Sequence, residues 1–220
     1  MRWALRCEWM AGRNTTSSQA MNIDAWNNSD ARWVAPLFAA AFTDDPGFRW
    51  MFPDSSRRSE QILWVQHFLI RAKKGITRRE HIERKATAQW AAPGTSPNVS
   101  FATELCAGIL GAPASLGLAA TIRGLRADHY VKLRLKRIER EAWYLDTLAV
   151  HPSEQGKGLG GALIRRGLQR AGASPVYLYT AKPSNVAFYR RFGFEITDES
   201  LLVPDGPPAW TMRRHQRVTA

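Results

Sequence analysis

Apolar positions recur at two different periods along the chain, and the changes of period predict a mixed α/β fold. The run from Trp143 to Val150 is apolar, aromatic and β-branched, which is typical of a buried strand. Pro152 ends this strand, because proline has no N–H to give to a sheet ladder. Apolar positions then recur at helical spacing from Gly161 to Arg170. The pattern therefore predicts a strand, a tight loop and a helix, in that order.

The remaining elements follow from the same two periods. We expect Asn27 to Asp30 to cap a helix over residues 31–42. Further helices are predicted over 55–74, 101–111, 115–140 and 184–191, with a break at Pro113, and 50–53 reads as a short apolar segment. Strands are predicted over 20–26, 76–83, 85–91, 175–180, 193–203 and 208–214. The length suits a single domain, for which we expect residues 21–215, with an N-terminal extension over 1–20 and a tail over 216–220.

The loop between the central strand and its helix carries the most distinctive motif, which is Gln155, Gly156, Lys157, Gly158, Leu159 and Gly160. The first turn of a helix has unpaired N–H groups and a partial positive charge, and glycines let a phosphate approach them closely. The alternative is a glycine-rich turn that binds nothing. No Ser or Thr follows Lys157 as in a P-loop, and the glycine spacing differs from that of dinucleotide folds. We therefore expect the diphosphate of another cofactor.

Two segments carry a family resemblance. The sequence Gln-x-x-Gly-x-Gly from Gln155 to Gly160 follows a strand that ends Leu-x-Val-x-Pro, and it resembles the pyrophosphate loop of the GNAT (GCN5-related) N-acetyltransferases. The segment from Asn185 to Phe194 resembles that family's Asn-x-x-x-Tyr-x-x-x-Gly-Phe sequence. The C-terminal part, from Trp143 to Met212, is most similar to the puromycin N-acetyltransferases.

The resemblance implies the GNAT fold, in which the parallel strands over 143–150 and 175–180 splay apart within a mixed sheet. The pantetheine arm of acetyl-CoA then takes the place of a missing strand, because the splayed backbones have N–H and C=O groups to satisfy.

The resemblance also implies roles for individual residues. The backbones of Leu148, Ala149 and Val150 are expected to bind the pantetheine, and an N–H near Leu148 to polarise the thioester carbonyl. Asn185 is expected to contact the cofactor, with a helix N-cap as the alternative. Tyr189 is expected to protonate the leaving thiolate as general acid, with a core aromatic as the alternative.

The acceptor side is less well defined. Strand alternation places Tyr144, Asp146, Leu148 and Val150 on one face, which makes Asp146 the candidate general base. Asp146 could instead bind a cationic acceptor, or a water chain could carry the proton. Weaker candidates for the base are Asp44, Asp45, Glu104 and His129. The resemblance implies that Trp90, which matches a tryptophan on the strand that lines the acceptor side in the similar enzymes, binds the acceptor. Tyr144 is also expected to bind it, beside an aromatic wall that suits a planar or apolar amine and is formed by Phe42, Trp50, Phe52 and Trp64.

Composition limits the remaining possibilities. The net charge of +12 permits nucleic-acid binding, but a solvated helix face is the simpler explanation, and we expect no nucleic-acid partner. Basic residues could also capture the polyanionic cofactor, for which Arg165, Arg166 and Arg190 are candidates. The two cysteines, Cys7 and Cys106, form no metal or redox motif and suggest a reducing, cytoplasmic setting, with Cys106 buried as a small apolar residue. We expect no membrane span.

Together these observations predict an acetyl-CoA-dependent N-acetyltransferase without a metal. The primary amine of a small molecule, such as an amino-nucleoside, is expected to attack the thioester directly in a monomer or homodimer. A protein or peptide amine is the alternative acceptor. A catalytically silent CoA-binding module and a nucleic-acid-binding protein are the rival classes.

Overall fold

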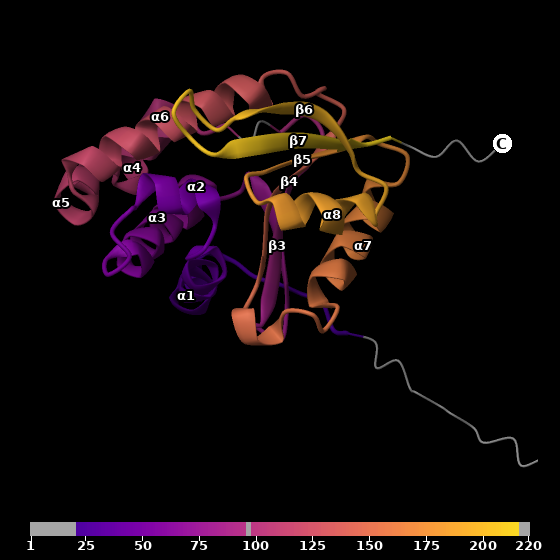
Figure 1. Ribbon diagram of the computed structural model, residues 1–220. Coiled ribbons are helices and arrows are strands. Elements are labelled where there is room, and N and C mark those ends of the chain that lie inside the picture. Colours follow the sequence, from indigo (N-terminus) through magenta and orange to yellow (C-terminus); the bar gives the residue numbers. More distant parts are fainter. Residues whose placement is uncertain (1–20, 96–97, 216–220) are drawn as a thin grey trace, which may run out of the picture.

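The computed structural model describes residues 21–95 and 98–215, and it has one mixed sheet of seven strands (Figure 1). The order across the sheet is β1-β2-β3-β4-β5-β7-β6, and β4 and β5 are its one parallel pair within these residues. This architecture confirms the α/β fold class and the mixed sheet. The strands are β1 (Asp24–Ala25), β2 (Thr77–Ile82), β3 (Ala86–Ala91), β4 (Trp143–Val150), β5 (Val176–Thr180), β6 (Glu195–Leu201) and β7 (Pro208–Arg214).

Helices cover both faces of the sheet. In Figure 1, α7 and α8 lie on one side of β3, α1 to α3 lie on the other, and α6 runs along the β6–β7 hairpin. The core divides in the same way, with α7 and α8 packed on β3, β4 and β5, and with α1 and α3 packed on Ala149 of β4. The helices are α1 (Ala31–Phe42), α2 (Pro46–Met51), α3 (Arg58–Ala72), α4 (Phe101–Ala107), α5 (Ala112–Leu116), α6 (Leu118–Leu135), α7 (Leu159–Ala171) and α8 (Pro183–Arg190).

Several boundaries differ from those expected from the sequence. Pro113 lies in the first turn of α5, where its missing N–H costs no hydrogen bond, and the break falls at Gly117, whose φ is 86°. Part of the apolar segment over 50–53 belongs to α2, which Asp45 caps. The first strand is limited to β1, and the expected extension over 1–20 and tail over 216–220 lie outside the described residues.

β4 and β5 separate after three paired positions. Trp143, Tyr144 and Leu145 pair with Val176, Tyr177 and Leu178, and the ladder stops there. β4 continues to Val150, and its other edge stays paired with β3. The edge of β4 that faces β5 is therefore open from Asp146 onwards, which confirms the splayed pair.

A bulge in β4 lies at the point where the strands separate. Gln89 of β3 pairs with Thr147 and Trp90 pairs with Leu145, so Asp146 is the extra residue. One extra residue reverses the alternation of the side chains beyond it. Leu148 accordingly packs with the α7 side of the core, whereas Ala149 packs against α1 and α3. The expectation that Tyr144, Asp146, Leu148 and Val150 share one face was therefore wrong.

Candidate active site

Two cavities meet where β4 and β5 separate. The first has a volume of about 590 Å³ and is lined by the end of β4, the start of α7, and α8. The second has a volume of about 380 Å³ and lies among α2, α3, α6 and β4. The residues that line both cavities are Phe42, Asp45, Leu148, Asn185 and Tyr189.

The glycine loop forms one wall of the first cavity. Gly158 precedes α7 with a φ of 84°, a conformation that other residues adopt only with strain. α7 has no side-chain cap, so the N–H groups of its first turn have no partner within the helix. A side chain at position 160 would meet Val150 Cγ2, which lies 3.3 Å from the Cβ position. The loop residues that line the cavity are Gln155, Gly156, Gly158, Leu159 and Gly160.

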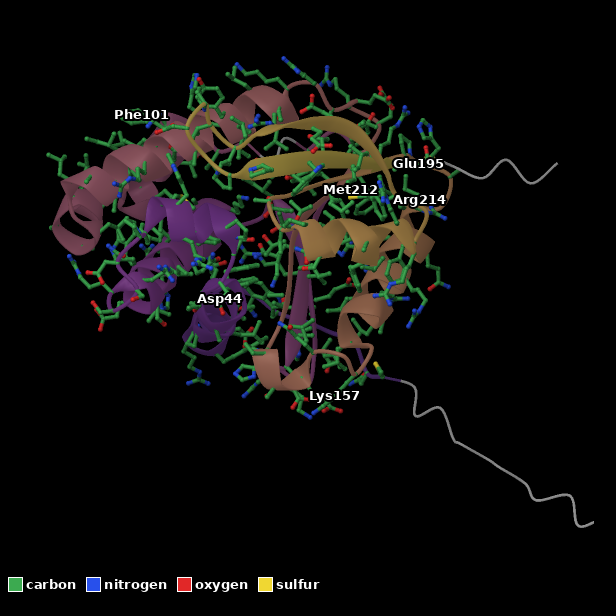
Figure 2. All side chains as sticks on the ribbon, in the orientation of Figure 1. Asp44, Phe101, Lys157, Glu195, Met212 and Arg214 are labelled. Carbon is green, nitrogen blue, oxygen red and sulfur yellow. The ribbon has the colours of Figure 1, made fainter. Side chains whose placement is uncertain are left out.

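The cations near this cavity differ from those expected. The Lys157 ammonium pairs with Glu154 at 3.1 Å, and its side chain is not part of the cavity wall. Figure 2 shows Lys157 at the outer edge of the loop before α7. Arg165 lines the cavity as expected, but Arg166 and Arg190 do not. Lys182 and Arg191 line it instead, and the sequence pattern missed both because their positions depend on the helix bounds.

The strand residues expected to bind the cofactor all line the first cavity, namely Leu148, Ala149 and Val150. Asn185 lines it too, and its side-chain Nδ2 donates a hydrogen bond to Thr180 Oγ1 at 3.1 Å. The N-cap of α8 is Lys182, so Asn185 is not the cap that its sequence position allowed.

Tyr189 is a core aromatic that also reaches both cavities. Its ring packs edge-on against Phe188 and Phe194, and the residue is 6% exposed. Burial raises the pKa of its phenol well above the ordinary value of 10, because the low-dielectric interior disfavours the phenolate. The phenol therefore keeps its proton at neutral pH.

The second cavity has mostly aromatic and aliphatic walls. Of the expected aromatic residues, Phe42, Phe52 and Trp64 line it, whereas the Trp50 indole N–H donates to the Asp205 carbonyl at 3.1 Å. Buried Tyr144 also lines it, as expected, and desolvation raises the pKa of this phenol well above its ordinary value. Other apolar residues in the wall include Phe48, Met51, Val65, Phe68, Leu69, Val99, Ile109, Leu116, Leu125, Val131, Leu135 and Leu202.

Trp90 does not line the acceptor side. It is fully buried on the opposite face of the sheet, where its ring packs over Gly167 of α7. The tryptophan alternates with Gln89 along β3, so it lies on the α7 side together with Leu145. Its expected contact with the acceptor was wrong for this reason. Cys106, expected to be buried, is exposed.

Four carboxylates line the second cavity, which are Asp45, Glu104, Asp128 and Asp146. Asp146 forms an ion pair of 2.6 Å with Lys73 at the end of α3. Asp45 Oδ1 accepts hydrogen bonds from the backbone N–H of Gly47 at 2.8 Å and of Phe48 at 3.3 Å. Asp44 and His129, which the sequence left as further candidates, line neither cavity.

No helix in the described ranges is long and apolar enough to cross a membrane. The same residues contain no group of three or more His, Cys, Asp or Glu side chains placed to hold a metal ion.

Comparisons with known proteins agree with this geometry. Residues 120–196 match the model of the GNAT acetyltransferase domain. A curated relative, the GCN5-like protein acetyltransferase Rv2170 of Mycobacterium tuberculosis, is 28% identical over 152 residues, which cover 65% of this chain and 74% of the relative.

Two solved structures show the same fold at low sequence identity. One is described as histone acetyltransferase HPA2 and related acetyltransferase from Corynebacterium glutamicum; it has a TM-score of 0.63 and 19% identity, and the match covers 91% of this chain and 98% of that one. Arylalkylamine N-acetyltransferase 2 from Aedes aegypti has a TM-score of 0.57 and 14% identity, over 89% of this chain and 99% of that one.

Proposed function

We propose that this chain transfers the acetyl group of acetyl-CoA to the primary amine of a small molecule, on the premise that its residues 120–196 match the GNAT acetyltransferase domain. The observation that carries the proposal is the junction of the two cavities at Leu148 and Tyr189. One cavity has the features of a phosphate and amide site, and the other has apolar walls. A donor and an acceptor that occupy them meet at this junction.

The first cavity suits the donor. Unpaired N–H groups at the start of α7 face a space where a diphosphate can approach Gly158 and Gly160 without a side chain in the way. Arg165, Lys182 and Arg191 supply positive charge around the same space. The open edge of β4 offers backbone groups to the pantetheine amides, as a sheet edge does to an added strand.

The chemistry takes place at the junction. The amine nitrogen attacks the thioester carbonyl, whose developing negative charge accepts a hydrogen bond from a backbone N–H near Leu148. The carbon–sulfur bond then breaks, and Tyr189 gives its proton to the departing sulfur. Burial raises the pKa of the phenol, so Tyr189 is protonated at neutral pH and has a proton to give.

The walls of the second cavity favour an acceptor with an apolar or planar body. An amino-nucleoside fits this description, and it is the acceptor that we expected from the sequence. A protein or peptide amine is the alternative, and the curated relative is named as a protein acetyltransferase. An assay of CoA release distinguishes the two acceptor classes, because peptide lysine and N-terminal amines can be compared directly with small amines.

The test measures thiol release and the mass of the product with acetyl-CoA and a panel of amines. We expect amine-dependent release of CoA, and for Tyr189→Phe a fall in kcat of about 100-fold with unchanged stabilisation by CoA against heat. If wild-type protein released no thiol with any amine and CoA did not stabilise it, the proposal would be wrong. If CoA stabilised the protein but Tyr189→Phe changed nothing, a silent CoA-binding module would be the better interpretation.

A further inference from the structure

The carboxylates of the second cavity differ in whether a cation neutralises them. Lys132 bridges Glu104 at 2.5 Å and Asp128 at 2.8 Å. Lys73 pairs with Asp146 at 2.6 Å. Among the described residues no Lys, Arg or His nitrogen is recorded in an ion pair with Asp45. Among the described residues, Asp45 is therefore the carboxylate of this cavity that is not held in an ion pair.

The position of Asp45 is fixed by the start of α2. Its Oδ1 atom accepts both capping hydrogen bonds, from Gly47 and Phe48, and Pro46 begins the helix. The other oxygen, Oδ2, has no hydrogen-bond partner within the described part of the chain and is not among its buried unsatisfied atoms. One oxygen thus anchors the side chain, and the other is available to a ligand.

Asp45 also lies at the junction of the cavities, because it lines both of them together with Leu148 and Tyr189. An amine that attacks the thioester must come close to Leu148 and Tyr189, according to the function proposed above. The apolar wall of the second cavity includes Phe42, Phe48 and Phe52, whose rings stack in a row. A ligand with a cationic group at the junction and an apolar body in the second cavity would match this arrangement.

We propose that the acceptor is a primary amine with an apolar or aromatic body, and that Asp45 holds its ammonium group and accepts a proton from it before the attack. The inference rests on the proposed acetyltransferase function and names its acceptor class and its general base. It replaces Asp146, the base expected from the sequence, because the Lys73 ammonium occupies that carboxylate at 2.6 Å.

The protons and electrons balance over the steps of this reaction. The ammonium gives one proton to the Asp45 carboxylate, and the neutral amine forms the new carbon–nitrogen bond to the thioester carbon. The carbon–sulfur bond breaks, the sulfur takes the proton of Tyr189, and the phenolate takes the second proton from the new amide nitrogen. Asp45 then releases its proton to solvent, so the products are the acetamide, CoA thiol and one proton.

The surroundings of Asp45 support this role. Burial raises the pKa of its carboxyl, and the capping hydrogen bonds and the charge of Lys182, which precedes α8, partly oppose that rise. Tyr179 of β5 also interacts with Asp45, and burial raises the pKa of its phenol to about 12, so it is neutral at pH 7. A carboxylate with a raised pKa is a better proton acceptor than an exposed one.

The test compares Asp45→Asn with two matched variants, Asp44→Asn and Asp146→Asn, using acetyl-CoA and 2-phenylethylamine. Asparagine caps a helix about as well as aspartate, so Asp45→Asn keeps the start of α2. We expect kcat/KM at pH 7 to fall at least 100-fold in Asp45→Asn and to change less than threefold in Asp44→Asn. We also expect the acidic limb of the pH profile to disappear in Asp45→Asn alone.

Binding measurements distinguish a failure of this inference from a failure of the proposed function. Because Asp45 holds the ammonium, we expect 2-phenylethylamine, but not the uncharged 2-phenylethanol, to bind at least tenfold more weakly to Asp45→Asn. CoA should stabilise every variant equally. If Asp45→Asn kept wild-type kcat/KM, or Asp146→Asn alone lost it, Asp45 would not be the base, yet the acetyltransferase function would stand. If wild-type protein acetylated peptides but none of the apolar amines, the acceptor class would be wrong.

Discussion

At the scale of single residues, Asp45 both caps a helix and is largely buried, and these two features shift the pKa of its carboxyl in opposite directions. Its carboxyl caps α2, but burial raises its pKa above the ordinary 3.8. The folded state therefore binds a proton more readily than the unfolded chain does. Above the folded pKa this carboxyl lowers the stability of the protein, and that cost disappears as the pH falls through the folded pKa towards 3.8.

We therefore predict that Asp45→Asn is at least as stable as the wild type at pH 7, although it is far less active. The amide keeps the cap and removes the cost of burying a charge. The difference in Tm should narrow as the pH falls through the folded pKa towards 3.8, since the wild-type carboxyl then takes up a proton in the folded state and no charge remains buried. Thermal unfolding of both proteins across this range measures the effect. A lower Tm for Asp45→Asn at pH 7 would show that the carboxylate itself stabilises the fold.

Adjacent residues show what sequence could and could not assign to the site. Asp44 and Asp45 are the same residue type in the same turn, but Asp45 caps α2 and lines both cavities, whereas Asp44 lines neither. The Asp-Pro-Gly order at 45–47 is a typical start of a helix, and it was the sequence signal that could have distinguished Asp45 from Asp44. Tyr189 and the glycine loop could be selected because the motif fixes their relation to the helices. No comparable motif marks the acceptor side.

At the scale of elements, periodicity predicted β4, α7 and β5 nearly to their ends, and it predicted their order in the chain. It could not predict the bulge at Asp146, because the bulge depends on the register between β3 and β4 rather than on β4 alone. That register determines on which face of the sheet the side chains of Asp146 and Leu148 lie. The face of Trp90 was wrong for a different reason, since a similar residue in another protein was taken to fix its direction.

The packing of α7 on β3 depends on the close approach of Gly167 to Trp90. A Cβ at position 167 would lie 2.0 Å from Trp90 Cζ2, so Gly167→Ala must displace the ring or the helix. We predict a loss of about 1–3 kcal/mol in the free energy of unfolding, as for other overpacked cores. Denaturant unfolding measures it. Gly124→Ala in α6 is the matched control, because nothing lies within 4 Å of its Cβ position, and it should be neutral or stabilising. Equal effects from both variants would contradict this explanation.

At the scale of the whole molecule, the splayed sheet connects two different environments. The sheet itself separates α7 and α8 from α1 to α3 (Figure 1). The two cavities meet at the opening between β4 and β5. The cavity proposed for the donor presents mainly backbone groups of the glycine loop, and its motif is therefore visible in the sequence. The cavity proposed for the acceptor is lined by side chains from α2, α3 and α6, whose arrangement follows from tertiary packing.

Because the cavities are joined, one molecule that spans both should bind more tightly than either half. We predict that 2-phenylethylamine linked through an acetyl group to the sulfur of CoA binds at least 100-fold more tightly than CoA, since linking makes the second contact intramolecular. Calorimetric titration of CoA, the linked compound and a matched compound with an n-butylamine in place of the phenylethylamine measures the gain. The butyl compound should gain less, because it leaves the aromatic part of the second cavity unfilled. Equal affinities for all three ligands would mean that the cavities are not continuous in solution, and the acceptor would then have to approach the thioester from elsewhere.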